Sequence, residues 1–329
     1  MIASLAGRPI LIDSASRFAL DAILPAIDHL LDPPPAPTEG DAIRWSIAEE
    51  DDAWRPDAFG PAGTYRIGGG GFAVVQNEPP SVESFLPGSG ITLRAAREAF
   101  MAGDFRAHPA SFALAAALSG PGRQVLHAGA VARDGAAALL VGVGGVGKST
   151  TALACAFAGA DFLGDDLVLV DAAGPDGPGP TVHSLFATAK LNPDSVLALG
   201  VTGWTPIGTT PKNKAVLAIR DRLSVIRSAA IVALVLLAPP VTGRPRPQPL
   251  RAAEAMSLVM PSSIPVACRT GSPAELLAVV AALARRVPAW RLPLSWDLDA
   301  LGTAVRGIVT EAADRLRRDV PRPGPGAAA

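Results

Sequence analysis

The stretch that decides the fold is LHAGAVARDGAAALLVGVGGVGKSTTALACAFAGADFLGDDLVLV, residues 126–170. Two apolar runs, 126–132 and 136–141, flank Asp134–Gly135, a dipeptide typical of a tight hairpin turn, so two antiparallel strands are expected. A glycine-rich loop follows, and then an alanine-rich helix over 148–158 that ends at a glycine. This alternation of strands and helices predicts an α/β core, and the hairpin before the loop predicts a mixed sheet.

The loop, GVGGVGKS, satisfies the pattern G-x-x-x-x-G-K-[ST] of a phosphate-binding P-loop. Its glycines let backbone N–H groups point inward, and the following helix adds partial positive charge, so the segment suits a polyphosphate. Lys148 is expected to reach the β- and γ-phosphates and the Ser149 hydroxyl to ligate Mg²⁺. A chance match in a glycine-rich chain is the alternative, but the strand before and the helix after favour the motif. The expected nucleotide-binding residues are Gly142, Val143, Gly144, Gly145, Val146, Gly147, Lys148, Ser149 and Thr150.

Two adjacent aspartates, Asp165 and Asp166, interrupt a second apolar run, residues 162–170. Successive strand side chains point to opposite faces, so both carboxylates can serve one site only if the strand ends or bends, which Gly164 permits. One carboxylate can then hold Mg²⁺ beside Ser149 while the other takes the proton of an acceptor hydroxyl. A close pair of carboxylates also raises the pKa of one member, which suits a base. The alternative is a turn with two solvated aspartates.

A single histidine, His127, lies on the strand that precedes the loop strand. Such a residue is usually part of the core. Together, however, LHAGAVA, the P-loop and FLGDDLVLV resemble the catalytic core of bacterial HPr kinase/phosphorylase over residues 126–171, and PKNKAVLAI resembles it more weakly over 211–219. The resemblance implies an α/β P-loop kinase core with a mixed sheet flanked by helices over 121–315. A small α+β region over 1–120 and a disordered tail over 316–329 complete the expected organisation.

The resemblance also implies roles for these residues. ATP and Mg²⁺ would be the cofactors, with Lys148 in the catalytic set and Ser149 and Asp165 on the metal. Asp166 would be the base, although the two aspartates could be exchanged. His127 would lie near the γ-phosphate or tune the aspartates.

The chain departs from that family where TVHSLFATAKLN, residues 181–192, replaces a Glu-Arg-Gly-Leu-Gly-Ile signature. There, Lys190 could supply charge to phosphates or be a solvated lysine, and His183 is expected to be structural or exposed. Further along, Lys214 and Lys212 could contact phosphate or acceptor, or simply flank a strand. Ser262 and Ser263 are expected at a helix N-cap or turn.

These departures make HPr a doubtful acceptor. The chain is more similar to HPr-kinase-like proteins of ribosomally made peptide pathways, lasso peptides above all. That similarity implies phosphoryl transfer to a serine near the C-terminus of a precursor peptide, with region 1–120 as a candidate peptide-binding part. A P-loop ATPase or switch without an acceptor, a scaffold that has lost its chemistry, an HPr-type protein kinase and a small-molecule kinase remain alternatives.

Composition narrows the remaining classes. The chain has 329 residues, 49% hydrophobic, which allows a sizeable core, and a formal net charge of −1, which argues against a nucleic-acid partner. Its two cysteines lie far apart, so a disulfide framework is not expected and a reducing cytoplasm fits. The longest apolar run, 229–238, is too short to span a bilayer and is expected to be a buried strand. We therefore expect a cytoplasmic protein without a membrane partner, and homo-oligomerisation stays open.

Patterning outside the central stretch predicts further elements. Strands are expected at 215–219 and 231–237, a hairpin at 64–75, and loops at 171–180 and 239–249. Helices are expected at 20–31 (kinked or restarted at Pro25), 91–102, 111–119, 252–259, 273–285 and 299–313.

Overall fold

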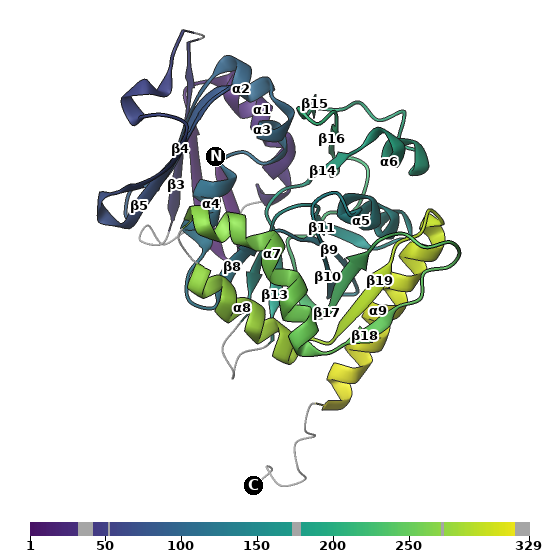
Figure 1. Cartoon of the computed structure of the whole chain (residues 1–329). Coiled ribbons are helices and arrows are strands. Elements are labelled where there is room, and N and C mark those ends of the chain that lie inside the picture. The colour runs from purple at the N-terminus through teal and green to yellow at the C-terminus, as the bar shows by residue number, and fades with distance from the viewer. Residues whose placement is uncertain (32–41, 52, 173–178, 271–272, 320–329) are drawn as a thin grey trace, which may run out of the picture.

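The computed structural model describes residues 1–31, 42–51, 53–172, 179–270 and 273–319. Over these ranges the chain forms two large mixed β-sheets flanked by helices, together with a small three-stranded sheet (Figure 1). The predicted α/β class with a mixed sheet is confirmed. No helix in the described ranges is both long enough and apolar enough to cross a bilayer.

The N-terminal sheet runs in the order β1-β2-β3-β7-β6-β5-β4. Its strands are β1 (Ile2–Leu5), β2 (Arg8–Ser14), β3 (Ile43–Glu50), β4 (Gly63–Ile67), β5 (Gly71–Asn77), β6 (Pro80–Leu86) and β7 (Gly90–Ala96). Three helices pack on it: α1 (Arg17–Ile27), α2 (Arg97–Met101) and α4 (Ser111–Leu118). A fourth, α3 (Gly103–Ala107), packs against α1, α2 and the small three-stranded sheet. The predicted hairpin at 64–75 and helix at 111–119 are confirmed.

Two predictions in this region need correction. The helix expected at 91–102 is wrong over its first half, because Ile91, Leu93 and Ala95 alternate into the core as strand β7. The helix expected at 20–31 begins earlier, where the Ser16 hydroxyl accepts the Ala19 N–H as an N-cap. It ends at Ile27, before a short 3-10 turn.

The central sheet runs in the order β11-β9-β10-β17-β13-β12-β8, with β19 also beside β17 and β18 beside β19. Strand β10 lies parallel to β17, and β17 lies parallel to β19. The Asp134–Gly135 turn has both residues at positive φ, as a two-residue hairpin requires. The strands are β8 (Arg123–Leu126), β9 (Gly129–Arg133), β10 (Ala136–Val141), β11 (Asp161–Gly164), β12 (Val168–Asp171), β13 (Thr181–Ser184), β17 (Ser228–Ala238), β18 (Gln248–Leu250) and β19 (Ala289–Pro293).

Helices cover both faces of the central sheet (Figure 1). Along β10, Leu139 packs towards α7 (Ala252–Thr270) and α8 (Pro273–Arg286), whereas Leu140 packs towards α5 (Lys148–Phe157) and α9 (Leu298–Asp319). Burial on both faces explains why this strand is continuously apolar. The small sheet beside α5 contains β14 (Thr188–Leu191), β15 (Gly208–Thr209) and β16 (Ala215–Ala218), and α6 (Pro193–Ala198) follows β14.

Helix α7 corrects another prediction. It continues from Ala252 to Thr270, so Ser262 and Ser263 lie inside a helix and not at an N-cap or turn. Burial of one helix face against the sheet outweighs the backbone donors lost at Pro261 and Pro265. The buried apolar residues of this helix are Ala255, Val259, Val266 and Ala267.

The apolar core crosses residue 120, where a boundary between regions was expected. Val125 and Phe186 belong to the same buried cluster as Ile23 and Trp45 of the N-terminal region. The division of roles between the two regions stays a prediction. Most of the predicted 171–180 loop and 320–329 of the predicted tail lie outside the described residues, and residues 316–319 belong to α9.

Candidate active site

The P-loop joins the end of β10 to the start of α5. Gly145 and Gly147 have φ values of 83° and 116°, a region that side-chain-bearing residues rarely adopt. The Lys148 ammonium donates to the carbonyls of Gly142 at 2.9 Å and Val143 at 3.3 Å. Burial lowers the pKa of Lys148, and the charges of the two aspartates oppose this effect. The loop therefore holds a buried cation against its own backbone, at the N-terminus of a helix.

The acidic pair lies where two neighbouring strand segments bend. Strand β11 ends at Gly164 and β12 begins at Val168, so the chain leaves strand geometry at the aspartates, as expected. The neighbouring segment breaks between β8 and β9, at His127. A Cβ added at Gly129 would lie 3.3 Å from the carbonyl oxygen of Asp165, so this glycine allows the two bends to approach closely.

Asp165 is buried beside the P-loop, with 3% of its surface exposed. Its Oδ2 accepts the backbone N–H of Lys190 at 2.8 Å, and its Oδ1 has no hydrogen-bond partner among the described residues. Burial first, and then the charge of Asp166, raise the pKa of Asp165 to about 6, while the nearby Ser149 hydroxyl acts in the opposite direction. A buried oxygen without a partner beside a hydroxyl fits a hard cation, so Ser149 and Asp165 suit Mg²⁺.

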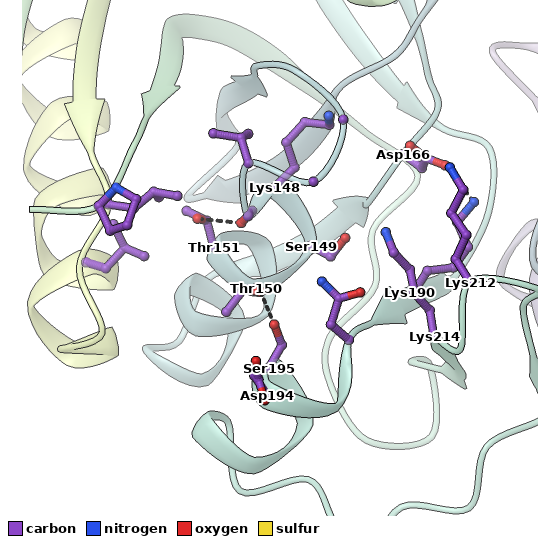
Figure 2. Close-up of a pocket in the computed structure, with 18 of the residues that line it drawn as sticks. Lys148, Ser149, Thr150, Thr151, Asp166, Lys190, Asp194, Ser195, Lys212 and Lys214 are labelled. Atoms are coloured by element: carbon purple, nitrogen blue, oxygen red, sulfur yellow. Dashed lines mark hydrogen bonds and ion pairs between the residues drawn. The ribbon is translucent and has the colours of Figure 1, made fainter.

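Asp166 faces the side chains of His127 and Lys190. Its Oδ1 lies 2.6 Å from His127 Nε2. Its Oδ2 lies 2.7 Å from Lys190 Nζ, and Figure 2 shows these two residues facing each other. Burial alone would raise the pKa of Asp166, but the hydrogen bond from His127 and the charge of Lys190 hold it well below its usual range. One carboxylate of the pair was expected to have a raised pKa, and that carboxylate is Asp165. Asp166 is the ionised member of the pair.

His127 is fixed by helix α7. Its backbone N–H donates to the Ser263 hydroxyl at 3.1 Å, and its Nδ1 lies 3.1 Å from the Ser262 carbonyl oxygen. The Ser262 carbonyl oxygen and the Asp166 carboxylate can only accept hydrogen bonds, so His127 acts as a hydrogen-bond donor between α7 and Asp166. The two serines position His127 through this helix, a role that their sequence context did not indicate.

The N-terminal region contributes two site residues, Asp104 and His108, that the sequence did not indicate. Lys190 Nζ lies 3.3 Å from His108 Nδ1 and 3.7 Å from Asp104 Oδ1. Burial, together with the charge of Lys190, lowers the pKa of His108 to about 3, so this ring is neutral and accepts from the lysine. Helix α3 can deliver both residues because Gly103 packs against the backbone of Thr209, where an added Cβ would lie 2.5 Å from the carbonyl carbon.

Asp104, His127, Asp166 and Lys190 border one cavity with the P-loop, and its volume of about 770 Å³ fits a nucleotide. Figure 2 shows Asp166, Lys190, Lys212 and Lys214 on one side of the P-loop helix. Of the predicted loop residues, 144–150 line the cavity, and the Thr150 hydroxyl also contacts that of Ser195 at 2.8 Å. The remaining lining residues include Asp104, His127, Asn192, Asp194, Thr210, Pro240, Leu294, Ser295, Trp296, Leu298 and Leu301.

Not every predicted residue reaches this cavity. Gly142 and Val143 serve by holding Lys148, and Asp165 lies beneath the lining. His183 lies half-buried on β13 outside the cavity lining, consistent with a structural position. Both Lys212 and Lys214 line the cavity. This position favours a contact with phosphate or acceptor over the alternative that they simply flank a strand.

The fold and the loop together define an α/β protein with a P-loop. No protein-family model matches the chain, and no curated protein matches it in sequence. Among solved structures, the chain is similar to the Hpr(Ser) kinase/phosphatase from Coxiella burnetii, with a TM-score of 0.34 and 13% sequence identity. That match covers 60% of this chain and 99% of the other.

Proposed function

We propose that this protein is an ATP-dependent kinase that transfers the γ-phosphoryl group of ATP to a serine hydroxyl. The observation that carries the proposal is the shared cavity. The P-loop and the carboxylate of Asp166 border the same space, and Lys190 of β14 is paired with Asp166 there. A polyphosphate site and an ionised carboxylate in one cavity are the two parts that phosphoryl transfer to a hydroxyl requires.

In this proposal the loop amides and Lys148 hold the β- and γ-phosphates. The serine oxygen forms a bond to the γ-phosphorus, the bond from that phosphorus to the β–γ bridging oxygen breaks, and ADP leaves. Asp166 orients the hydroxyl and accepts its proton, while Lys190 offsets negative charge on the transferred group. Mg²⁺, when held by Ser149 and Asp165, would neutralise phosphate charge.

An aspartate with a depressed pKa is a weak base, yet it suits this reaction. In a loose transition state the attacking hydroxyl has little bond to phosphorus and keeps its proton until late. The carboxylate then acts mainly by orientation, and what matters is that it stays ionised. The hydrogen bond from His127 and the charge of Lys190 both favour the ionised form of Asp166.

For the acceptor, we propose a serine of a ribosomally made precursor peptide of the lasso type. The similarity of LHAGAVA, GKSTTALA, FLGDD and LFATAKL to kinases of such pathways supports this choice. The contribution of Asp104 and His108 from the N-terminal region supports it further, because that region then borders the place where an acceptor would enter.

The test is Asp166→Asn, assayed by mass spectrometry of a candidate peptide incubated with enzyme and Mg·ATP. Transfer should fall by about 10²- to 10⁴-fold because the ionised carboxylate that orients the hydroxyl and accepts its proton is lost, while ATP affinity changes by less than about threefold. Asp299→Asn, an exposed aspartate in the first turn of α9, is the matched control and should keep wild-type transfer.

Wild-type transfer by Asp166→Asn would reject this base. A peptide that gains no phosphate group would reject that peptide as the acceptor. A third outcome is full-rate ATP hydrolysis without any acceptor, at the same rate in Asp166→Asn and Asp299→Asn. This result would instead favour an ATPase or switch.

A further inference from the structure

A tight corner between β19 and α9 presents an exposed tryptophan to the cavity. Trp296 lines the cavity with 65% of its surface exposed, among the largest exposures of any large apolar side chain in the described residues. Leu294, Leu298, Leu301 and Pro240 line the same part of the wall. An indole in contact with water is unfavourable, and a flat apolar ligand that covered it would gain free energy by removing both surfaces from water.

The corner that carries this indole is held by backbone and side-chain hydrogen bonds. The Leu294 N–H donates to Ala238 O at 3.1 Å, and Leu294 O accepts the Val241 N–H at 2.9 Å. The Ser295 hydroxyl donates to Gly243 O at 3.0 Å and accepts the Asp297 N–H at 3.1 Å. Trp296 is thus an exposed aromatic residue in a segment that is already ordered, so ligand binding there loses little conformational entropy of the protein.

The corner lies on the opposite side of the P-loop from the acidic pair. Strands β10, β17 and β19 are parallel neighbours, so their carboxyl ends place the P-loop and the corner along one sheet edge. The two touch, because a Cβ added at Gly147 would lie 2.8 Å from Leu294 Cδ1. In Figure 2, β19 and α9 lie across the P-loop helix from Asp166 and Lys190. A nucleotide whose terminal phosphate points to Asp166 therefore extends its base towards the corner.

We propose that Trp296 is the stacking face of a nucleobase subsite, with Leu294, Leu298 and Pro240 as its apolar surround. This assignment rests on nucleotide binding at the P-loop, as the proposed function does, but not on phosphoryl transfer. It divides the cavity into an apolar base end and a charged transfer end, with the glycine loop between them.

The subsite should discriminate weakly between purines. Stacking depends on a π-face that every base has, and base identity is read by hydrogen bonds to the base edge. Among the residues that line this corner, Ser295 carries the polar side chain, and its hydroxyl is engaged by Gly243 and Asp297. ATP and GTP should accordingly bind with affinities within about tenfold of each other.

Isothermal titration calorimetry of the full chain with Mg·ATP, Mg·GTP and inorganic tripolyphosphate tests the proposal. Trp296→Ala should weaken ATP and GTP by about 5- to 150-fold and leave tripolyphosphate within about twofold, since only the nucleotides carry a base. Trp296→Phe should recover most of the loss. Phe59→Ala, an exposed aromatic of the N-terminal region, should change none of the three.

Three results would overturn the subsite. They are unchanged ATP affinity in Trp296→Ala, equal losses for ATP and tripolyphosphate, or a wild-type preference for ATP over GTP beyond about 100-fold. If the wild type bound neither ATP nor tripolyphosphate, both this proposal and the kinase proposal would fall. Base-dependent binding together with full-rate ATP hydrolysis in the absence of any acceptor would keep the subsite and reject the kinase.

Discussion

The buried carboxyl of Glu83 links the N-terminal sheet to helix α4, and it predicts how the stability of the fold changes with pH. Glu83, on β6, is 7% exposed, and its Oε2 accepts the N–H groups of Phe112 and Ala113, each at 3.0 Å. Burial raises the pKa of Glu83 to about 7, although these two hydrogen bonds act in the opposite direction. The proton on this carboxyl is therefore linked to the stability of the fold.

The sign and size of the effect follow from that pKa. The folded state binds the proton more tightly than the unfolded chain, where the pKa is 4.5, so stability is lost as pH rises through about 7. A pKa change from 4.5 to about 7 is worth about 3 kcal/mol, at 1.36 kcal/mol for each tenfold change in proton affinity. About 2.5 kcal/mol of this loss should fall between about pH 5 and pH 8.5.

Glu83→Gln removes the titrating proton and keeps an oxygen that can accept both N–H groups. Urea unfolding at the two pH values should show that the variant loses about 2.5 kcal/mol less free energy of unfolding than the wild type. Glu98→Gln, at an exposed position on α2, should follow the wild type. A Glu83→Gln variant that lost stability as steeply as the wild type would refute the reasoning.

Two further substitutions test the site. Lys190→Ala should lower kcat by about 10²- to 10³-fold, because a cation beside Asp166 is lost, while the KM for ATP stays within about threefold. Steady-state kinetics measure this, and equal losses in both parameters would contradict the assignment. Asp165→Asn should raise the Mg²⁺ concentration for half-maximal rate by about tenfold or more, because one of two proposed oxygen ligands loses its charge. A Mg²⁺ titration identical to that of the wild type would show that the carboxylate does not bind the metal.

Local signals explain why the centre of the molecule could be predicted from the sequence. The Asp134–Gly135 turn, the P-loop and the bend at Gly164 each depend on a few adjacent residues whose backbone needs are specific. These segments also lie close together in the site because β10, α5 and β11 follow one another directly along the chain.

Long-range packing explains what the sequence could not show. The alternation of Ile91, Leu93 and Ala95 is short enough to be mistaken for one face of a helix until β3 and β6 pair with it. Asp104 and His108 come from a five-residue helix and its cap, without a motif, and reach the site only because Gly103 allows α3 to pack on the backbone at Thr209.

The ion pair between Lys190 and Asp166 suggests how nucleotide and base could be coupled. An acceptor hydroxyl must compete for a carboxylate that already faces two donors, and His127 is held in place by α7. Lys190 is the longer and more flexible partner, and a phosphate would be an alternative anion for its ammonium. Because Lys190 lowers the pKa of Asp166, its move towards phosphate would make the carboxylate more basic when the phosphoryl group is in place. The acid limb of kcat/KM, which reports the free enzyme, should accordingly lie at higher pH in Lys190→Ala than in the wild type, whereas the acid limb of kcat, which reports the nucleotide complex, should stay near that of the wild type. A kcat limb that moved as far as the kcat/KM limb would exclude this coupling.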